Sequence, residues 1–281
     1  MGRLINLFFL NSTQARFMNK IHQEISNNLY AFYDQIALIS KIPSEIQDHW
    51  SVIQNTPGSW PRIIYKITPE IVEPGSSLLF SEKVNSGSYP EILIAGDENI
   101  RQIDPFLRTK GFYPFAGWKG MAITKELWES FIQTNKTFPK LPNNIEIIKT
   151  ESPEDIEQWI KVVTSQLVAP ARLEKPLLKS LIAHPAFEAF LLKHDGVGVS
   201  TVLVFTSEQS TGLYLIATEQ SAQRQGFAQL LVQQVIYQAR QRSIHPVVLH
   251  ATPKGEALYS KLGFMPFNQF YLYRSLNTQR V

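Results

Sequence analysis

The segment TEQSAQRQGFA, residues 218–228, joins two periodic stretches and decides how the second half of the chain folds. Before it, residues 213–217 place apolar side chains on both faces, as in a strand buried inside a sheet. After it, an apolar residue recurs every four positions over 227–239, which predicts a helix with one core-facing stripe. The segment is therefore predicted to be a turn between a buried strand and a helix.

This turn has the properties of a phosphate site. The first N–H groups of a helix have no partner within the helix, and the helix dipole adds roughly half a positive charge there. Gly226 and Ala228 carry little or no side chain, so an anion can approach the backbone. Gln223 and Arg224 can add side-chain donors. A pyrophosphate is the ligand we expect.

The turn resembles the cofactor loop of the GNAT superfamily of acyl-CoA-dependent N-acyltransferases, which has the pattern Gln/Arg-x-x-Gly-x-Gly/Ala. Gln223, Gly226 and Ala228 match it, whereas Arg224 stands where most members carry glycine. The resemblance implies acetyl-CoA as cosubstrate and no metal. The implied coenzyme-binding residues are Ile216, Ala217, Thr218, Gln223, Arg224, Gln225, Gly226, Phe227 and Ala228.

A second block strengthens the resemblance. Residues 247–252 form a short apolar strand, and residues 253–264, PKGEALYSKLGF, follow it. This block is similar to the closing Leu-Tyr-x-x-Leu-Gly-Phe segment of the family. Over 211–273 the phosphate turn, helix, strand, second helix and final strand occur in the order of the family. The resemblance implies a mixed α/β fold, the GNAT fold, over about 145–273.

The chain is long enough for two domains, which we place at residues 1–137 and 143–281, on either side of a two-proline stretch. Residues 106–115 parallel residues 258–267, with Gly, Phe, Pro and Phe at aligned positions. We therefore predict two tandem GNAT-like copies, the first one degenerate. Residues 73–76 stand where the phosphate turn should be, without a long amphipathic helix behind them, so only the C-terminal copy is expected to bind CoA.

Further elements follow from local signals. Asp195-Gly196 predicts a hairpin turn, Ser152-Pro153 a helix start, and the stripe from Phe17 to Phe32 a helix that packs on the core. The opening residues 1–10 predict a core strand or helix edge and no signal peptide. The remaining predictions are a strand over 145–149, a helix over 172–183, hairpin strands over 187–193 and 197–205, and a strand over 91–96.

Transfer of an acyl group to an amine requires particular groups. Tyr259 matches the tyrosine that commonly serves as general acid in the family, and a phenol can donate a proton while it is neutral. An oxyanion contact is expected from the backbone N–H groups near residues 216–218. The start of the cofactor strand, Ser210-Thr211-Gly212, has no carboxylate to act as base. His250, through water, and Glu219 are the candidate bases, and the sequence leaves both open.

Composition narrows the class of function. The chain of 281 residues has a net charge of +3 and no cysteine, which excludes a thiolate nucleophile and a Cys-ligated zinc. It has no basic run with interleaved aromatics and no membrane-length apolar run, so we expect neither a nucleic-acid partner nor membrane insertion. The expected protein is cytoplasmic and either a monomer or a homodimer.

The sequence therefore predicts an N-acetyltransferase in which a primary amine attacks acetyl-CoA directly and Tyr259 protonates the departing thiolate. The acceptor is a small-molecule or peptide amine, and a protein N-terminus or lysine is a further possibility. The alternative is a non-catalytic acyl-CoA-binding or regulatory module. The absent strand carboxylate and Arg224 favour that alternative.

Overall fold

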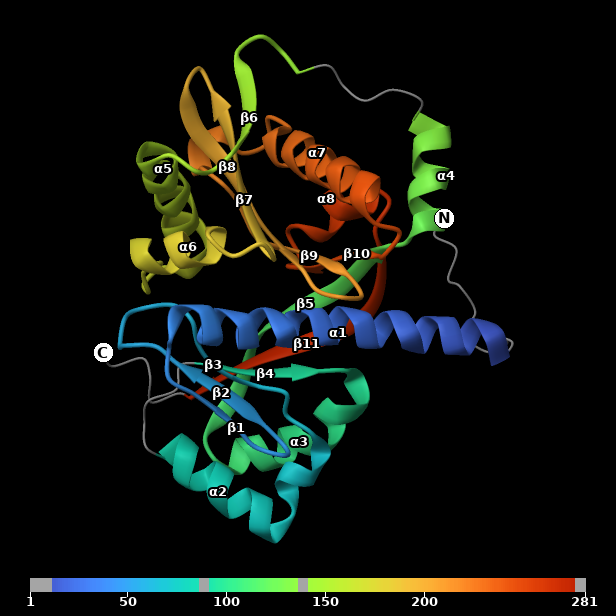
Figure 1. Ribbon diagram of the computed structural model, residues 1–281. Coiled ribbons are helices and arrows are strands. Elements are labelled where there is room, and N and C mark those ends of the chain that lie inside the picture. Colours follow the sequence, from blue (N-terminus) through green and yellow to red (C-terminus); the bar gives the residue numbers. More distant parts are fainter. Residues whose placement is uncertain (1–11, 86–90, 136–140, 276–281) are drawn as a thin grey trace.

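The computed structural model describes residues 12–85, 91–135 and 141–275. Within them the strands form one sheet of 11, in the order β1-β2-β3-β4-β11-β5-β10-β9-β8-β7-β6 (Figure 1). The strands are β1 (Ser44–Ile46), β2 (Ser51–Gln54), β3 (Arg62–Tyr65), β4 (Glu91–Ala95), β5 (Phe112–Ile123), β6 (Ile145–Lys149), β7 (Phe187–His194), β8 (Val197–Thr206), β9 (Thr211–Thr218), β10 (Val247–Ala251) and β11 (Met265–Ser275).

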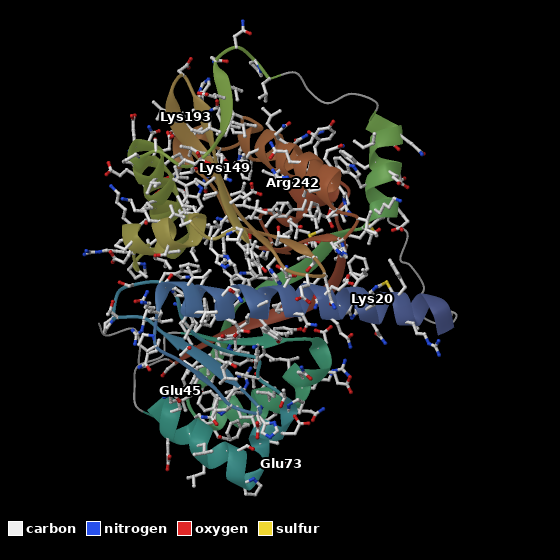
Figure 2. All side chains as sticks on the ribbon, in the orientation of Figure 1. Lys20, Glu45, Glu73, Lys149, Lys193 and Arg242 are labelled. Atoms are coloured by element: carbon white, nitrogen blue, oxygen red, sulfur yellow. The ribbon has the colours of Figure 1, made fainter. Side chains whose placement is uncertain are left out.

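Helices cover both faces of this sheet. On one face of the sheet, α5 and α6 share a buried cluster with α1. On the opposite face, α4, α7 and α8 share another buried cluster. In Figure 2, charged residues such as Glu73 and Lys193 lie at the edges of the molecule. The helices are α1 (Ser12–Ser40), α2 (Pro74–Asn85), α3 (Asp97–Thr109), α4 (Lys125–Asn135), α5 (Pro153–Val163), α6 (Lys175–Ile182), α7 (Phe227–Arg242) and α8 (Glu256–Lys261).

The two halves of the chain exchange their closing strands. β5, from the first half, pairs with β10 of the second half, and β11 returns to lie between β4 and β5. The sheet order is therefore symmetric about the exchanged pair β11–β5, with the parallel pairs β3–β4 and β9–β10 on its two sides, and the second half adds one outer strand, β6. Each closing strand follows a helix and a glycine in the left-handed region, Gly111 or Gly263. This symmetry agrees with the duplication predicted from residues 106–115 and 258–267.

The helix α1 runs across the junction and contacts both halves (Figure 1). Asn28 accepts a hydrogen bond from the Tyr214 hydroxyl at 2.7 Å, and Asp34 accepts one from the Tyr65 hydroxyl at 2.6 Å. The rings of Phe32 and Tyr214 stack with their centroids 3.8 Å apart. One helix of the first half thus orders the cofactor strand β9 of the second half.

Most local predictions are confirmed, and the errors have physical reasons. The predicted stripe of α1 is buried from Ile21 onward, but Phe17 is 46% exposed because the first turns of α1 extend past the sheet (Figure 1). The helix predicted over 172–183 begins only at Lys175, where Pro176 fixes its first turn. Residues 74–76 belong to α2 itself, a helix of 12 residues that is only partly buried. The strand or helix edge predicted for 1–10 lies outside the described residues, as does part of the predicted domain boundary.

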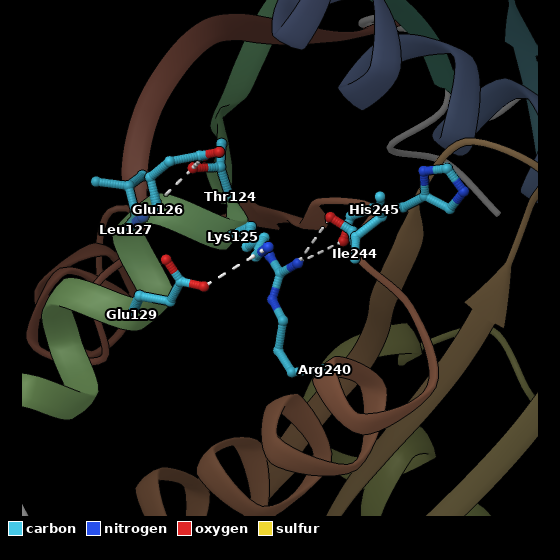
Figure 3. A network of polar contacts seen from close by, with 8 residues as sticks. All are labelled: Thr124, Lys125, Glu126, Leu127, Glu129, Arg240, Ile244 and His245. Carbon is cyan, nitrogen blue, oxygen red and sulfur yellow. Dashed lines mark hydrogen bonds and ion pairs between the residues drawn. The ribbon is translucent and has the colours of Figure 1, made fainter.

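Arg240 connects α7 to the ends of two other segments of the chain. Figure 3 shows its side chain beside the turn before β10. Its Nη1 atom donates to the carbonyl oxygens of Ile244, at 3.2 Å, and His245, at 2.7 Å, in the turn before β10. Its Nη2 atom donates to the carbonyl oxygen of Ile123 at the end of β5. Burial lowers the pKa of Arg240 to about 10. The guanidinium thus links α7 to the end of β5 and to the turn before β10.

Replacing Arg240 by methionine should lower the free energy of unfolding by about 1.5–3 kcal/mol, because it removes the charged donor from the carbonyl oxygen of the buried residue Ile123 and from two exposed carbonyl oxygens. Arg242→Met is the matched control. Arg242 pairs with Glu188 at 2.5 Å but its side chain is 59% exposed, so its loss should cost at most about 1 kcal/mol. Urea unfolding followed by circular dichroism measures both. Equal losses in the two variants would contradict the assigned role of Arg240.

Candidate functional site

The strands β9 and β10 separate part of the way along their length. Their parallel pairing runs from Thr211–Val247 to Leu213–Leu249 and then stops, although both strands continue. A bulge at Leu215, whose φ is +47°, shifts the register of β9 against β8 at the same point. We call the facing backbone edges of 214–218 and 250–251 the wedge. Unpaired strand edges of this kind can hydrogen-bond an extended polar chain laid between them.

The turn that follows β9 presents free backbone donors. Gly226 has φ +85° and caps the N-terminus of α7, and Arg224 is also left-handed, with φ +64°. Within the described chain, no hydrogen bond uses the backbone N–H groups of residues 224–228. A Cβ on Gly226 would meet no atom within 4 Å, so the backbone conformation, not space in the folded chain, requires glycine there.

The two side chains that the sequence offered as phosphate donors differ in their contacts. Arg224 is exposed, and none of the described residues holds its guanidinium. Gln223 is also exposed, but its Nε2 atom donates to the carbonyl oxygen of Thr218 at 3.1 Å and to Gln166 Oε1 at 3.3 Å. Arg224 is thus available to an anion, whereas the amide of Gln223 orders the turn.

Gln166 was not found from the sequence. It lies on a π-helical turn, Thr164–Val168, that follows α5, and besides Gln223 it reaches Glu219 Oε2 at 3.5 Å. Single π-turns are frequent at functional sites because they redirect a side chain away from the regular helix surface. No motif in 164–168 gives a local signal for this contact, which joins segments more than 50 residues apart.

Tyr259 lies on α8, directly after β10, and is buried. Its ring packs edge-on against Phe264 at a centroid distance of 6.1 Å, and a Cβ at Gly255 would come within 2.9 Å of it. Burial raises the pKa of Tyr259, so the phenol stays protonated. It shares its buried cluster with Ile216 of β9, on the face of the sheet covered by α7.

His250 is the first residue of β10 beyond its last pair with β9, on the opposite face of the sheet from Tyr259. Its ring lies 4.5 Å from that of Phe270, 6.0 Å from Tyr214 and 6.4 Å from Trp118. Both ring nitrogens are buried without a hydrogen-bond partner in the described chain. Burial lowers the pKa of His250 to about 3, so the imidazole is neutral at physiological pH.

The structure separates the two candidate bases. His250 lies at the inner end of the wedge, where the strands part, whereas Glu219 follows the outer end of β9. Glu219 lies five positions after Tyr214, roughly 16 Å of extended chain. The described residues include no group of three or more His, Asp or Glu side chains that could hold a metal ion. None of the described helices is long and apolar enough to cross a membrane.

Known proteins share part of this sequence and most of this fold. Residues 147–271 match the family model of the acetyltransferase (GNAT) domain. A GCN5-related N-acetyltransferase from Kribbella flavida superposes with a TM-score of 0.62 at 15% identity, covering 89% of this chain and 95% of the other. A GCN5-related N-acetyltransferase from Sphaerobacter thermophilus gives 0.58 at 15% identity, covering 80% and 75%.

A tandem GNAT protein from the clavulanic acid biosynthesis pathway also superposes, with a TM-score of 0.58 at 11% identity, covering 80% of this chain and 77% of the other. No curated protein matches the chain. Identities this low show a shared fold, while the family model assigns the second half. The chain has a GNAT fold like that of tandem GNAT structures, and residues 147–271 of its second half match the acetyltransferase (GNAT) domain model.

Proposed function

We propose that the protein is an N-acetyltransferase that transfers an acetyl group from acetyl-CoA to a primary amine by direct attack. The observation that carries this proposal is the wedge between β9 and β10 together with the free N–H groups at the start of α7. The wedge accepts an extended arm, and the helix start accepts an anion. A coenzyme with a diphosphate at one end of a pantetheine arm fits both.

Each part of the coenzyme has a proposed partner. The N–H groups of residues 224–228 bind the diphosphate, and Arg224 adds a charge that glycine cannot supply. The backbone of Ile216 to Thr218 pairs with the arm, so that the thioester lies at the inner end of the wedge. The backbone N–H groups near Ile216 then stabilise the oxyanion of the tetrahedral intermediate.

The chemistry needs one proton removed and one supplied. The neutral amine attacks the thioester carbon, the carbon–sulfur bond breaks, and the thiolate takes a proton from the Tyr259 hydroxyl. With its pKa near 3, His250 accepts a hydrogen bond from the amine but does not hold a proton at neutral pH. The proton lost by the amine therefore passes to solvent, and a proton taken up from solvent restores the Tyr259 hydroxyl, so that amine and acetyl-CoA give the amide and the free CoA thiol. Glu219, at the outer end of the wedge, is assigned to ordering the turn with Gln166.

Gly226→Glu tests the coenzyme site. The variant forces a side chain into a left-handed position and sets a carboxylate against the diphosphate, so acetyl-CoA affinity should fall by about 100-fold or more. Gly196→Glu is the matched control, because Gly196 has φ +78°, open space around its Cβ and a hairpin position in a different turn. Isothermal titration should show unchanged affinity for the control. Wild-type affinity in Gly226→Glu would refute the proposed site.

A turnover assay distinguishes the proposed enzyme from the alternative, a non-catalytic acyl-CoA-binding module. Thiol release from acetyl-CoA is measured with a panel of small primary amines, a peptide with a free N-terminus and a peptide with a lysine. Amine-dependent release supports the enzyme. Binding of acetyl-CoA without release by any acceptor favours the binding module.

A further inference from the structure

The bulge in β9 leaves two residues outside the pairing of the sheet. On the side of β8, the register passes from Tyr214 directly to Ala217. On the side of β10, the pairing ends at Leu213. Leu215 and Ile216 are therefore paired with neither neighbouring strand. Another contact has to hold the backbone of these two residues where the wedge begins.

A buried hydroxyl of β8 supplies that contact. Thr201 Oγ1 donates to the carbonyl oxygen of Leu215 at 3.0 Å, and Thr201 is fully buried, so water does not compete for this bond. On the preceding residue, Ser200 Oγ donates to the carbonyl oxygen of Ala217 at 2.9 Å. Two neighbouring side chains thus hold two carbonyl groups of β9 toward β8.

The direction of each carbonyl group fixes the direction of the next N–H group. A peptide group is planar and trans, so its carbonyl and its N–H point to opposite sides. Because the Leu215 carbonyl points toward β8, the N–H of Ile216 points away from β8 and toward β10. The held carbonyl of Ala217 turns the N–H of Thr218 the same way. Pairing with β10 has ended before these residues, so both N–H groups open into the wedge.

The conformation that produces this orientation is one that leucine does not adopt freely. Leu215 has φ +47°, in the left-handed region, where its Cβ crowds the backbone. A residue keeps such a conformation when the surrounding structure holds it there. The hydrogen bond from Thr201 acts on the Leu215 carbonyl itself and therefore opposes rotation of this peptide group back toward a relaxed strand.

We propose that Thr201 is a positioning residue for acyl transfer: its hydroxyl holds the peptide group between Leu215 and Ile216 so that the Ile216 N–H points at the carbonyl oxygen of the thioester. The inference rests on the proposed acetyltransfer, in which this N–H stabilises the oxyanion. Thr201 lies on β8, one strand away from the wedge, and acts through the backbone of β9. A donor fixed in advance stabilises the transition state without first having to reorient.

Thr201→Val tests this role, because valine has nearly the shape of threonine and lacks the hydroxyl. The peptide group is then free to turn, so kcat should fall about 10- to 100-fold while the Kd of acetyl-CoA stays within about threefold. Thr201→Ser should restore most of kcat, and Thr201→Cys, with its weak S–H donor, should give an intermediate value. Thiol release with the most active amine of the panel measures kcat, and isothermal titration measures Kd.

Thr150→Val is the matched control for the substitution. Thr150 is fully buried like Thr201, but its hydroxyl has no partner among the described residues. Removing that hydroxyl takes no hydrogen bond away from the wedge. The kcat of Thr150→Val should therefore equal that of the wild type.

Infrared spectroscopy measures the contact without turnover. The probe is acetyl-CoA carrying a heavy isotope at the acetyl carbonyl, bound without an acceptor, and the difference from unlabelled acetyl-CoA isolates the thioester carbonyl band. A hydrogen bond from the Ile216 N–H lowers the frequency of this band relative to free acetyl-CoA. The band should return toward its solution frequency in Thr201→Val and stay lowered in Thr201→Ser and Thr150→Val.

The outcomes distinguish this inference from the proposed function. If the wild type releases thiol and Thr201→Val keeps both kcat and the lowered band, the proposed function stands and the role of Thr201 is refuted. An equal loss of kcat in Thr201→Ser refutes that role as well. If the wild type binds acetyl-CoA without releasing thiol, the proposed acetyltransfer fails, and the infrared band still decides whether Thr201 orients the Ile216 N–H. Absence of acetyl-CoA binding refutes both.

Discussion

Residues 143–281 produced without residues 1–137 are expected to give no folded acetyltransferase domain. β10 would lose β5, its antiparallel partner along five residue pairs. β11, which is 11 residues long, would lose both of its neighbouring strands, β4 and β5. The apolar face of β9 and β10 would also lose α1, including the stacked pair of Phe32 and Tyr214. Exposed edges and apolar surface of this extent favour aggregation over folding.

Producing the two segments together is the informative comparison. Residues 1–137 and 143–281 made in one cell should associate, purify as a 1:1 complex and bind acetyl-CoA, because strand pairing supplies the contacts without a covalent link. Thermal unfolding of the single segment should show no cooperative transition. A cooperative transition and wild-type coenzyme affinity for 143–281 alone would mean that β11 can close its own sheet, and would contradict the need for the exchanged strands.

Elements with local signals were predictable from the sequence. The Ser152 side chain caps α5 by accepting from the Asp155 N–H at 3.1 Å, as the Ser-Pro-acid pattern predicts. Asp195 and Gly196 both adopt positive φ in the hairpin turn between β7 and β8. The turn between β9 and α7 was predictable for the same reason, because its glycine and the helix start are adjacent in the chain.

The exchange of closing strands was not predictable, because both halves present the same local pattern. Gly111 and Gly263 each end a helix with positive φ, and a strand follows each of them. Nothing within either strand specifies whether its partners come from its own half or from the other half. Residues 120, 250 and 268 likewise become neighbours only through the exchange, so their adjacency could not be predicted.

The position of Arg224 shows how the structure can explain a departure from the family pattern. The residue adopts φ +64°, a conformation that glycine reaches without strain and arginine does not. Most family members carry glycine at this position. The chain thus retains a residue whose backbone is disfavoured by roughly 1–2 kcal/mol. A guanidinium without a partner in the described residues, next to a row of free N–H groups, offers a reason for keeping it.

Tyr259→Phe should lower turnover by about 100- to 10,000-fold while acetyl-CoA affinity and stability stay close to wild type. The hydroxyl is the only group removed, and the ring that packs on Phe264 and fills the space beside Gly255 remains. Because burial raises the pKa of Tyr259, the wild-type hydroxyl stays protonated through the neutral range and can donate to the thiolate. Steady-state kcat from thiol release and isothermal titration of acetyl-CoA measure the two quantities separately.

Tyr273→Phe is the matched control for this prediction. Tyr273 is equally buried on β11, but its hydroxyl donates to Asp104 Oδ1 at 2.6 Å in the first half of the chain. Losing that bond can lower stability without touching the wedge, so kcat per folded molecule should be unchanged. Loss of kcat in Tyr259→Phe but not in Tyr273→Phe would identify the Tyr259 hydroxyl, on α8, as the proton donor to the thiolate. Wild-type kcat in that variant would leave Tyr259 as a packing residue and require another proton source for the thiolate.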